Sequence, residues 1–344
     1  MPAKLTGLLA FGASLALLAL LAWAIGDRLD GPAILAAWAA LDPWHLAGAL
    51  ACGVVNILVM GRRWALLIAW TTPARPGTLR LAGVTWMAAF VAHGAPAAAF
   101  GDVARMAAMR FSGGLGTRDA VQSVLFDRLT GLISLVALGW LMLLVQGLLA
   151  VPSTLLVGQG AMLALGTLAP LLALTLAGHG WVGRRARLRP VFEAVRAYRG
   201  VIGDGGRLIR QGGLGVATVV LAALVFWLLG RGMGFDLALG RVLLFTPAIL
   251  LINNLPVLYL GWGGREAAVI ATLGATAPAL DAWLGPGLAP SQALALSIAF
   301  GLAFLLTSLP GGLMLLPALR RRALPPGAPP PTGQSGPSQG GRSW

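Results

Sequence analysis

The chain has 344 residues, of which 58% are hydrophobic and only 10% are charged, and its formal net charge is +14. Soluble globular proteins carry about 25% charged residues, so this composition excludes an ordinary soluble domain. In a soluble protein the basic excess would suggest nucleic-acid binding. In a membrane protein it is explained by topology and by affinity for anionic lipid, so no nucleic-acid partner is predicted.

Long apolar runs predict an all-α fold, a polytopic helical bundle in a membrane. Several runs exceed the roughly 18 residues that a helix needs to cross a bilayer, and they are continuous rather than alternating. Residues 5–25 also resemble a signal peptide, but their apolar part is longer than the usual stretch of about 7–15 residues, which favours an uncleaved span. Six clear spans are expected, at residues 5–25, 45–60, 120–148, 154–177, 213–229 and 293–316.

The distribution of charge predicts that both termini face the cytoplasm. Residues 26–43 carry three aspartates against one arginine and are placed outside. Residues 181–210 contain eight arginines and are placed inside by the positive-inside rule. We expect one membrane domain over residues 1–320 and a disordered tail, rich in Pro, Gly and Ser, over residues 321–344.

A break in the apolar pattern at residues 93–96 predicts a re-entrant helical hairpin over residues 79–116. If this stretch crossed the membrane once, the next two spans would deliver the arginine-rich loop to the outer face. A hairpin that dips in and returns keeps that loop inside, and Pro96 allows broken backbone at its tip. The alternative is an additional full span formed by residues 105–116.

A second break, at residues 253–256, separates residues 242–256 from residues 263–280. These two stretches form either two spans or a second hairpin that begins and ends outside. The first broken pair is entered from the cytoplasm and the second from outside, which is typical of an inverted-topology repeat. The two halves would be residues 1–180 and 211–320, joined by the arginine-rich loop.

Ionisable residues follow each break, and in lipid such residues are costly and usually face a protein interior or a wet cavity. Asp102 and Arg105 are three apart on a predicted helix and can share a face, so we expect them to pair. Asp127 and Arg128 are adjacent, so on a helix their side chains point about 100° apart and need partners from elsewhere.

Arg265 and Glu266 are also adjacent, and we expect that they cannot both pair locally. The charges are best neutralised if the three groups, at residues 102–105, 127–128 and 265–266, meet in the centre of the bundle. One arginine would then be left to hold an anion. The alternative is that the ion pairs only fix helix packing. The candidate substrate-binding residues are Pro96, Gly101, Asp102, Arg105, Asp127, Arg128, Asn253, Pro256, Gly263, Gly264, Arg265 and Glu266.

Nothing in the sequence points to catalysis. The three histidines are scattered, with no Cys or carboxylate cluster at ligand spacing, so no metal site is suggested. The single cysteine, Cys52, is expected to be a buried residue that fills space in the helix packing and has no chemical role. No nucleophile accompanies the carboxylates, so enzymatic activity is not favoured and no cofactor is expected.

Two charged segments together resemble the lysylphosphatidylglycerol synthase transmembrane, or flippase-like, family. The first consists of APAAAFGDVAR at residues 95–105 and SVLFDRLTGL at residues 123–132, and the second is LPVLYLGWGGREAA at residues 255–268. The similarity spans roughly residues 7–319. The chain departs from the family pattern at Asp127, where the family more often has Glu, and at the residues before Pro96, and these departures affect the substrate more than the fold.

The resemblance implies a bacterial inner-membrane protein that binds or translocates a polar-headed lipid, either an anionic or modified phospholipid or a glycolipid. The aminoacyl-transferase domain of full-length synthases is expected to be absent. The alternative function is a non-transporting membrane subunit that presents lipid to a separate glycosyl- or aminoacyl-transferase, or scaffolds it. Anionic membrane lipids are therefore the expected partners, and a homo-oligomer is left open.

Overall fold

The computed structural model describes residues 30–94, 99–112, 115–176, 189–253 and 264–314, and all regular secondary structure in these ranges is helical. The predicted all-α class is confirmed. The predicted first span and the predicted tail lie outside the described residues. The helices are α2 (Gly31–Ala39), α3 (Pro43–Thr71), α4 (Thr78–Gly94), α5 (Ala99–Ser112), α6 (Thr117–Leu148), α7 (Ser153–Leu176), α9 (Arg189–Ile202), α10 (Gly205–Gly232), α11 (Leu239–Asn253), α12 (Gly264–Leu273), α13 (Pro278–Leu284) and α14 (Pro290–Leu313).

Four of the described helices, α3, α6, α10 and α14, are long and apolar enough to cross a membrane. They correspond to four of the six predicted spans. Helix α7 corresponds to a fifth, but its described apolar section, Ser153–Leu168, is shorter. Large aliphatic side chains such as Leu144, Val157 and Leu165 are exposed on α6 and α7, as expected for surfaces that face lipid.

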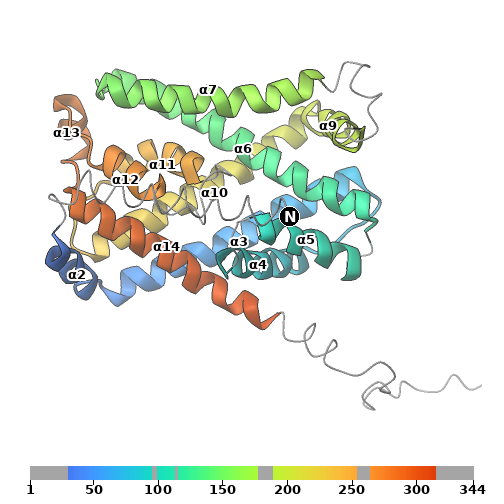
Figure 1. Ribbon diagram of the computed structural model, residues 1–344, viewed down its shortest axis with the longest axis horizontal. Coiled ribbons are helices and arrows are strands. Elements are labelled where there is room, and N and C mark those ends of the chain that lie inside the picture. The colour runs from blue at the N-terminus through green and yellow to red at the C-terminus, as the bar shows by residue number, and fades with distance from the viewer. Residues whose placement is uncertain (1–29, 95–98, 113–114, 177–188, 254–263, 315–344) are drawn as a thin grey trace, which may run out of the picture.

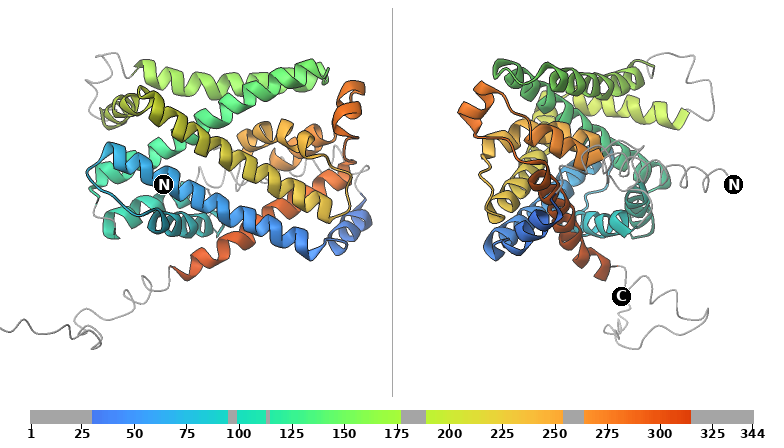
Figure 2. Two further views of the ribbon diagram at one scale, coloured as in Figure 1. Left: turned by 180° about the vertical axis from the view of Figure 1, so that it is seen from behind. Right: turned by 60° about the vertical axis from the view of Figure 1, so that its left-hand side comes forward.

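The long helices run lengthwise through the molecule, and short helices lie at its two ends (Figure 1). Helices α2 and α13 are at one end and α9 is at the other. Helices α3 and α10 pack along their lengths, as the view from behind in Figure 2 shows. In the largest apolar core, Phe226 of α10 stacks on Phe300 of α14 with a centroid distance of 3.7 Å.

Two short helical pairs interrupt this arrangement. Helices α4 and α5 pack together as a hairpin between α3 and α6, as predicted for residues 79–116. Helices α11 and α12 form the second pair, between α10 and α14. The first pair occupies the half of the molecule near α9 and the second the half near α2 and α13 (Figure 1). The inverted repeat itself stays a prediction.

Glycines bring α4 unusually close to three neighbouring helices. A Cβ atom on Gly61 of α3, Gly101 of α5 or Gly311 of α14 would lie 2.7 Å or less from backbone atoms of α4. A larger residue at any of these positions would force a backbone to move. Small residues at such interfaces are what allow membrane helices to pack with their backbones in contact.

A buried arginine fixes the sharp bend of 91° between α12 and α13. Arg241 of α11 is fully buried and donates hydrogen bonds at 2.6 Å to the Asp281 carboxylate and at 2.6 Å to the Ala275 carbonyl. The carbonyls of Leu284 and Gly285 also accept from this guanidinium. Because these acceptors lie before, within and after α13, Arg241 fastens α11 to the bent pair.

Candidate functional site

A buried ion network joins α3, α5 and α6 in the half of the molecule near α9. Asp127 of α6 is only 1% exposed. One of its carboxylate oxygens accepts from Arg63 Nε at 2.8 Å, and the other accepts from Arg105 Nη2 at 2.8 Å. Hydrogen bonds between two ionised groups are about twice as strong as neutral ones, so Asp127 is the anchor that ties α3 and α5 to α6.

The neighbours of both arginines are shaped for guanidinium groups. A Cβ atom on Gly131 of α6 would lie 3.3 Å from the Arg63 nitrogens, so glycine leaves the space that this side chain needs. The Arg105 guanidinium lies over the buried Trp64 ring, with Cζ 4.0 Å from the centroid. This cation–π contact favours the charged side chain in its buried position.

Arg128 points away from Asp127 and pairs with a different helix. Its Nε lies 2.9 and 3.1 Å from the two carboxylate oxygens of Asp102 on α5. The prediction that Asp127 and Arg128 take partners from elsewhere is confirmed. The predicted pair of Asp102 with Arg105 is loose, at 3.9 Å, because Arg105 is drawn to Asp127. The Arg128 side chain remains 49% exposed.

A cavity of about 130 Å³ lies beside this network, among α3, α4, α5, α6 and α14. Its wall includes Arg105, Asn56 and Thr85, each more than nine-tenths buried. The Arg105 Nε, the Asn56 Oδ1 and the Thr85 Oγ1 have no hydrogen-bond partner in the described structure. A buried polar atom without a partner costs roughly 1–3 kcal/mol, so these atoms mark the place where a polar ligand or water is best accommodated.

The second network lies at the start of α12, and here the expectation that Arg265 and Glu266 cannot pair locally was wrong. Arg265 Nη2 donates to Glu266 Oε1 at 2.7 Å and Arg265 Nε donates to the same oxygen at 3.2 Å, because the long arginine side chain can reach the neighbouring carboxylate. Ser297 of α14 joins the group, with its hydroxyl 3.1 Å from Arg265 Nε and 3.2 Å from Glu266 Oε1. Gly301 of α14 leaves room for this guanidinium, as Gly131 does for Arg63.

The described contacts form two networks, rather than the single central cluster that we expected. Helix α14 belongs to the second network through Ser297, and it lines the cavity beside the first network. The Arg265 guanidinium lies 5.8 Å from the Phe300 ring centroid, and Phe300 contacts Phe304, which lines the cavity beside Arg105. Of the other predicted site residues, Gly101 packs against α4, Gly264 begins α12 and Asn253 ends α11, while Pro96, Pro256 and Gly263 lie outside the described residues.

Four residues of these sites were not predicted from the sequence: Arg63, Asn56, Thr85 and Ser297. Arg63 stands beside Arg62 just after the predicted span at residues 45–60, where a basic pair is explained by the positive-inside rule alone. Helical phase could have separated it from Arg62, because Arg63 follows Asn56 by seven residues, about two turns, and so lies on the same helix face. Thr85 and Ser297 stand in apolar runs, and nothing in the sequence distinguishes them from other hydroxyl residues there.

The chemistry available at the cavity is that of charge and hydrogen bonding. It offers guanidinium donors from Arg105 and Arg128, the carboxylate of Asp102, and the side chains of Asn56 and Thr85. Within the ranges that the structure describes, no group of three or more His, Cys, Asp or Glu side chains could hold a metal ion. This set of groups suits the binding of an anion that also carries hydroxyl or amino groups.

Comparison with known proteins adds one finding. Residues 9–311 match the family described as Lysylphosphatidylglycerol synthase TM region. The matched region contains both helical pairs and both ion networks. No curated protein and no solved structure matches the chain significantly.

Proposed function

Because the chain belongs to the lysylphosphatidylglycerol synthase transmembrane-region family, we propose that it binds a lipid head group in the cavity beside Arg105 and moves that lipid across a bacterial inner membrane. The observation that carries the proposal is the cavity wall. It combines a buried guanidinium that has an unpaired Nε with two further unpaired polar atoms, from Asn56 and Thr85. In a membrane bundle such atoms are retained at a cost, which is typical of a substrate path.

The charge of the network favours an anionic head group. Three arginines and two aspartates give the network one more cation than anion. Asp127 already holds Arg63 and Arg105, so the excess positive charge is best shared between Arg105 and Arg128 at the cavity. A phosphate ester would accept hydrogen bonds from both guanidinium groups, and Asp102 would accept from a hydroxyl or amine on the same head group.

The exposure of the network fits a lipid better than a free solute. Half of the Arg128 side chain is exposed, and it borders the cavity. A head group could therefore enter from the side while its acyl chains stay in the bilayer. A cavity of about 130 Å³ has room for the polar part of one lipid and not for its chains. The proposed substrates are thus anionic or modified phospholipids or glycolipids.

The main test is Arg105→Gln, measured as translocation of fluorescent phosphatidylglycerol in proteoliposomes. We expect most of the translocation to be lost, because the guanidinium that faces the cavity is gone. The protein should remain folded, because Asp127 keeps Arg63 as a partner. A folded R105Q protein that translocates at the wild-type rate would refute the proposed site.

A second variant tests the cavity without changing charge. Thr85→Val removes an unpaired hydroxyl from the wall, so we expect slower translocation with unchanged or higher thermal stability. Thr246→Val is the matched control, because Thr246 is equally buried on α11 and bonds its own helix at 2.7 Å. It should leave translocation unchanged.

The same reconstitution separates translocation from lipid presentation. If the wild-type protein binds phosphatidylglycerol in an Arg105-dependent way but moves it no faster than protein-free liposomes do, the chain acts as a presenting subunit for a separate transferase. Acceleration of translocation by the purified chain alone would exclude that alternative.

A further inference from the structure

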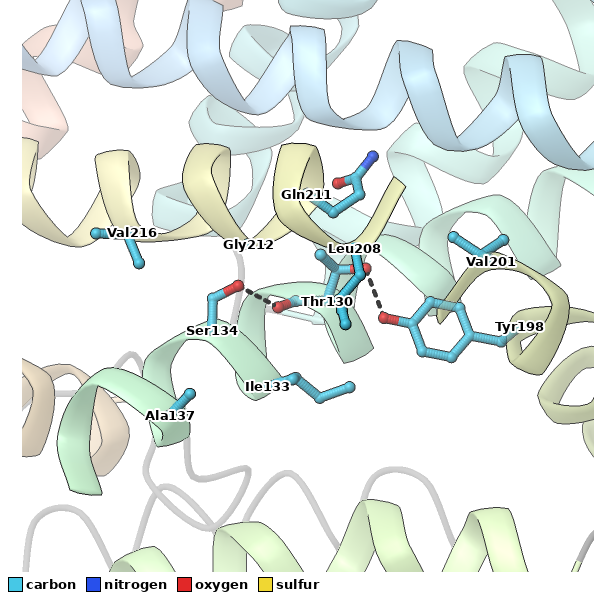
Figure 3. Close-up of a pocket in the computed structure, with 10 residues that line it drawn as sticks. All are labelled: Thr130, Ile133, Ser134, Ala137, Tyr198, Val201, Leu208, Gln211, Gly212 and Val216. Carbon is cyan, nitrogen blue, oxygen red and sulfur yellow. Dashed lines mark hydrogen bonds between the residues drawn. The ribbon is translucent and has the colours of Figure 1, made fainter. Parts of the chain in front are cut away.

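A second cavity, of about 180 Å³, lies between α6, α9 and α10 (Figure 3). None of its lining residues belongs to the wall of the cavity beside Arg105. Most of the side chains around it are aliphatic or small, such as Ile133, Ala137 and Val216. The function proposed above does not use this space.

The hydroxyl groups around this cavity already have partners. The Tyr198 and Thr130 hydroxyls are 2.8 Å apart, and Ser134 donates to the Thr130 carbonyl at 2.9 Å (Figure 3). Burial raises the pKa of the Tyr198 phenol, so this group stays neutral at physiological pH. Gln211 also lines the cavity: its amide N–H donates to the Arg63 carbonyl at 3.1 Å, and its Oε1 is buried without a partner in the described structure. Apart from this one acceptor the described wall is neutral and largely apolar, so it favours a hydrocarbon chain over an ion or a sugar.

The cavity opens along one stripe of α10. Leu208, Gly212 and Val216 recur every four residues, so they lie on the same side of the helix. Leu208 is 44% exposed and Val216 is 37% exposed, while a Cβ atom on Gly212 would meet nothing within 4 Å. The absence of a side chain at Gly212 thus leaves a slot between two exposed aliphatic residues, on a helix long enough to span a membrane.

Basic side chains surround the same end of the molecule. Arg196 and Arg199 on α9 and Arg210 on α10 are exposed, and α9 turns its buried residues Tyr198 and Val201 toward the cavity. Over residues 189–210 there are five arginines against one glutamate and one aspartate. Exposed arginines at the bilayer surface attract anionic head groups.

We propose that this cavity is a second lipid site, which holds an acyl chain of an anionic phospholipid whose head group lies among the arginines of α9 and α10. The apolar slot favours a hydrocarbon chain, and the flanking arginines favour a head group with negative charge. The lipid held here would fasten α9 to α6 and α10. The site is independent of the translocation proposed above.

Photo-crosslinking of the full chain in vesicles tests the site. The probe is phosphatidylglycerol with a diazirine in one acyl chain, and the phosphatidylcholine with the same chain is its zwitterionic counterpart. We expect phosphatidylglycerol to label residues 130–137 and 208–216, and phosphatidylcholine to label them more weakly. The proposal is overturned if the wild-type chain shows no labelling in these segments, or if both lipids label them equally.

Two neighbouring glycines provide a matched pair of variants. Gly212→Leu fills the slot, whereas Gly213→Leu makes the same change on the exposed side of α10, where a Cβ also meets nothing within 4 Å. We expect G212L to lose most of the labelling and G213L to keep it. Equal labelling in the two variants would refute the slot. Arg105→Gln should keep the labelling whatever it does to translocation, so the two proposals can fail separately.

Discussion

Asp127 is the residue on which the first network depends, because two buried guanidinium groups share its carboxylate. Asp127→Asn would remove the carboxylate that Arg63 and Arg105 share, and would leave Arg105 with only the looser contact to Asp102 at 3.9 Å. Removing one partner of a buried ion pair costs about 3–5 kcal/mol, so we expect a large loss of stability. Thermal unfolding of the purified protein in detergent measures it.

Asp236→Asn is the control for this variant. Asp236 is 86% exposed and lies 3.6 Å from Arg231, so it belongs to a surface ion pair. Exposed pairs contribute little to stability, and this change should hardly move the unfolding midpoint. Equal midpoints for D127N and D236N would show that Asp127 is not an anchor.

Single charges could be predicted from the sequence, but their partners could be predicted only in part. Helical phase predicted that the side chains of Asp127 and Arg128 point in different directions and need separate partners. This is confirmed, because each pairs with a residue on another helix. Helical phase gave the wrong result for Arg265 and Glu266, whose side chains contact each other. Backbone phase gives the direction in which a side chain leaves the helix, and a long side chain can reverse that direction.

At the scale of elements, α4 is the helix most constrained by its neighbours, since α3, α5 and α14 all contact it through glycine. We expect Gly61→Ala and Gly311→Ala each to destabilise the protein by about 1–3 kcal/mol, as overpacking does. Gly158→Ala on α7 is the control, because a Cβ there meets nothing within 4 Å. The measurement is thermal unfolding. Unchanged unfolding midpoints for both Gly61→Ala and Gly311→Ala would contradict the close packing.

The hairpin of α4 and α5 could be predicted from a charge count and a helix-breaking proline. The glycine contacts that hold it could not be predicted. The chain has 48 glycines, and their function depends on which helix each one faces. That information comes from the packing of distant segments, such as Gly311 against α4, and no local pattern contains it.

At the scale of the whole molecule, the end of α3, which precedes Arg75, packs against α9, which carries Arg199. Helix α2, which follows Asp30, lies at the other end of the molecule (Figure 1). In a chain with Cys52→Ala, single cysteines at positions 75 and 199 should react with a membrane-impermeant maleimide only from the cytoplasmic side. A cysteine at position 30 should react only from outside. Labelling of positions 75 and 199 from opposite sides of intact cells would refute this topology.

Arg241 bears on how the chain enters its membrane during synthesis. Its carboxylate partner, Asp281, is 40 residues further along the chain, so α11 leaves the ribosome well before that partner exists. An arginine without acceptors is costly in lipid, and the missing acceptors arrive only with α13. We therefore expect helix α11 to reach its final position only after α12 and α13 have been made, so that these three helices insert as one unit rather than one by one.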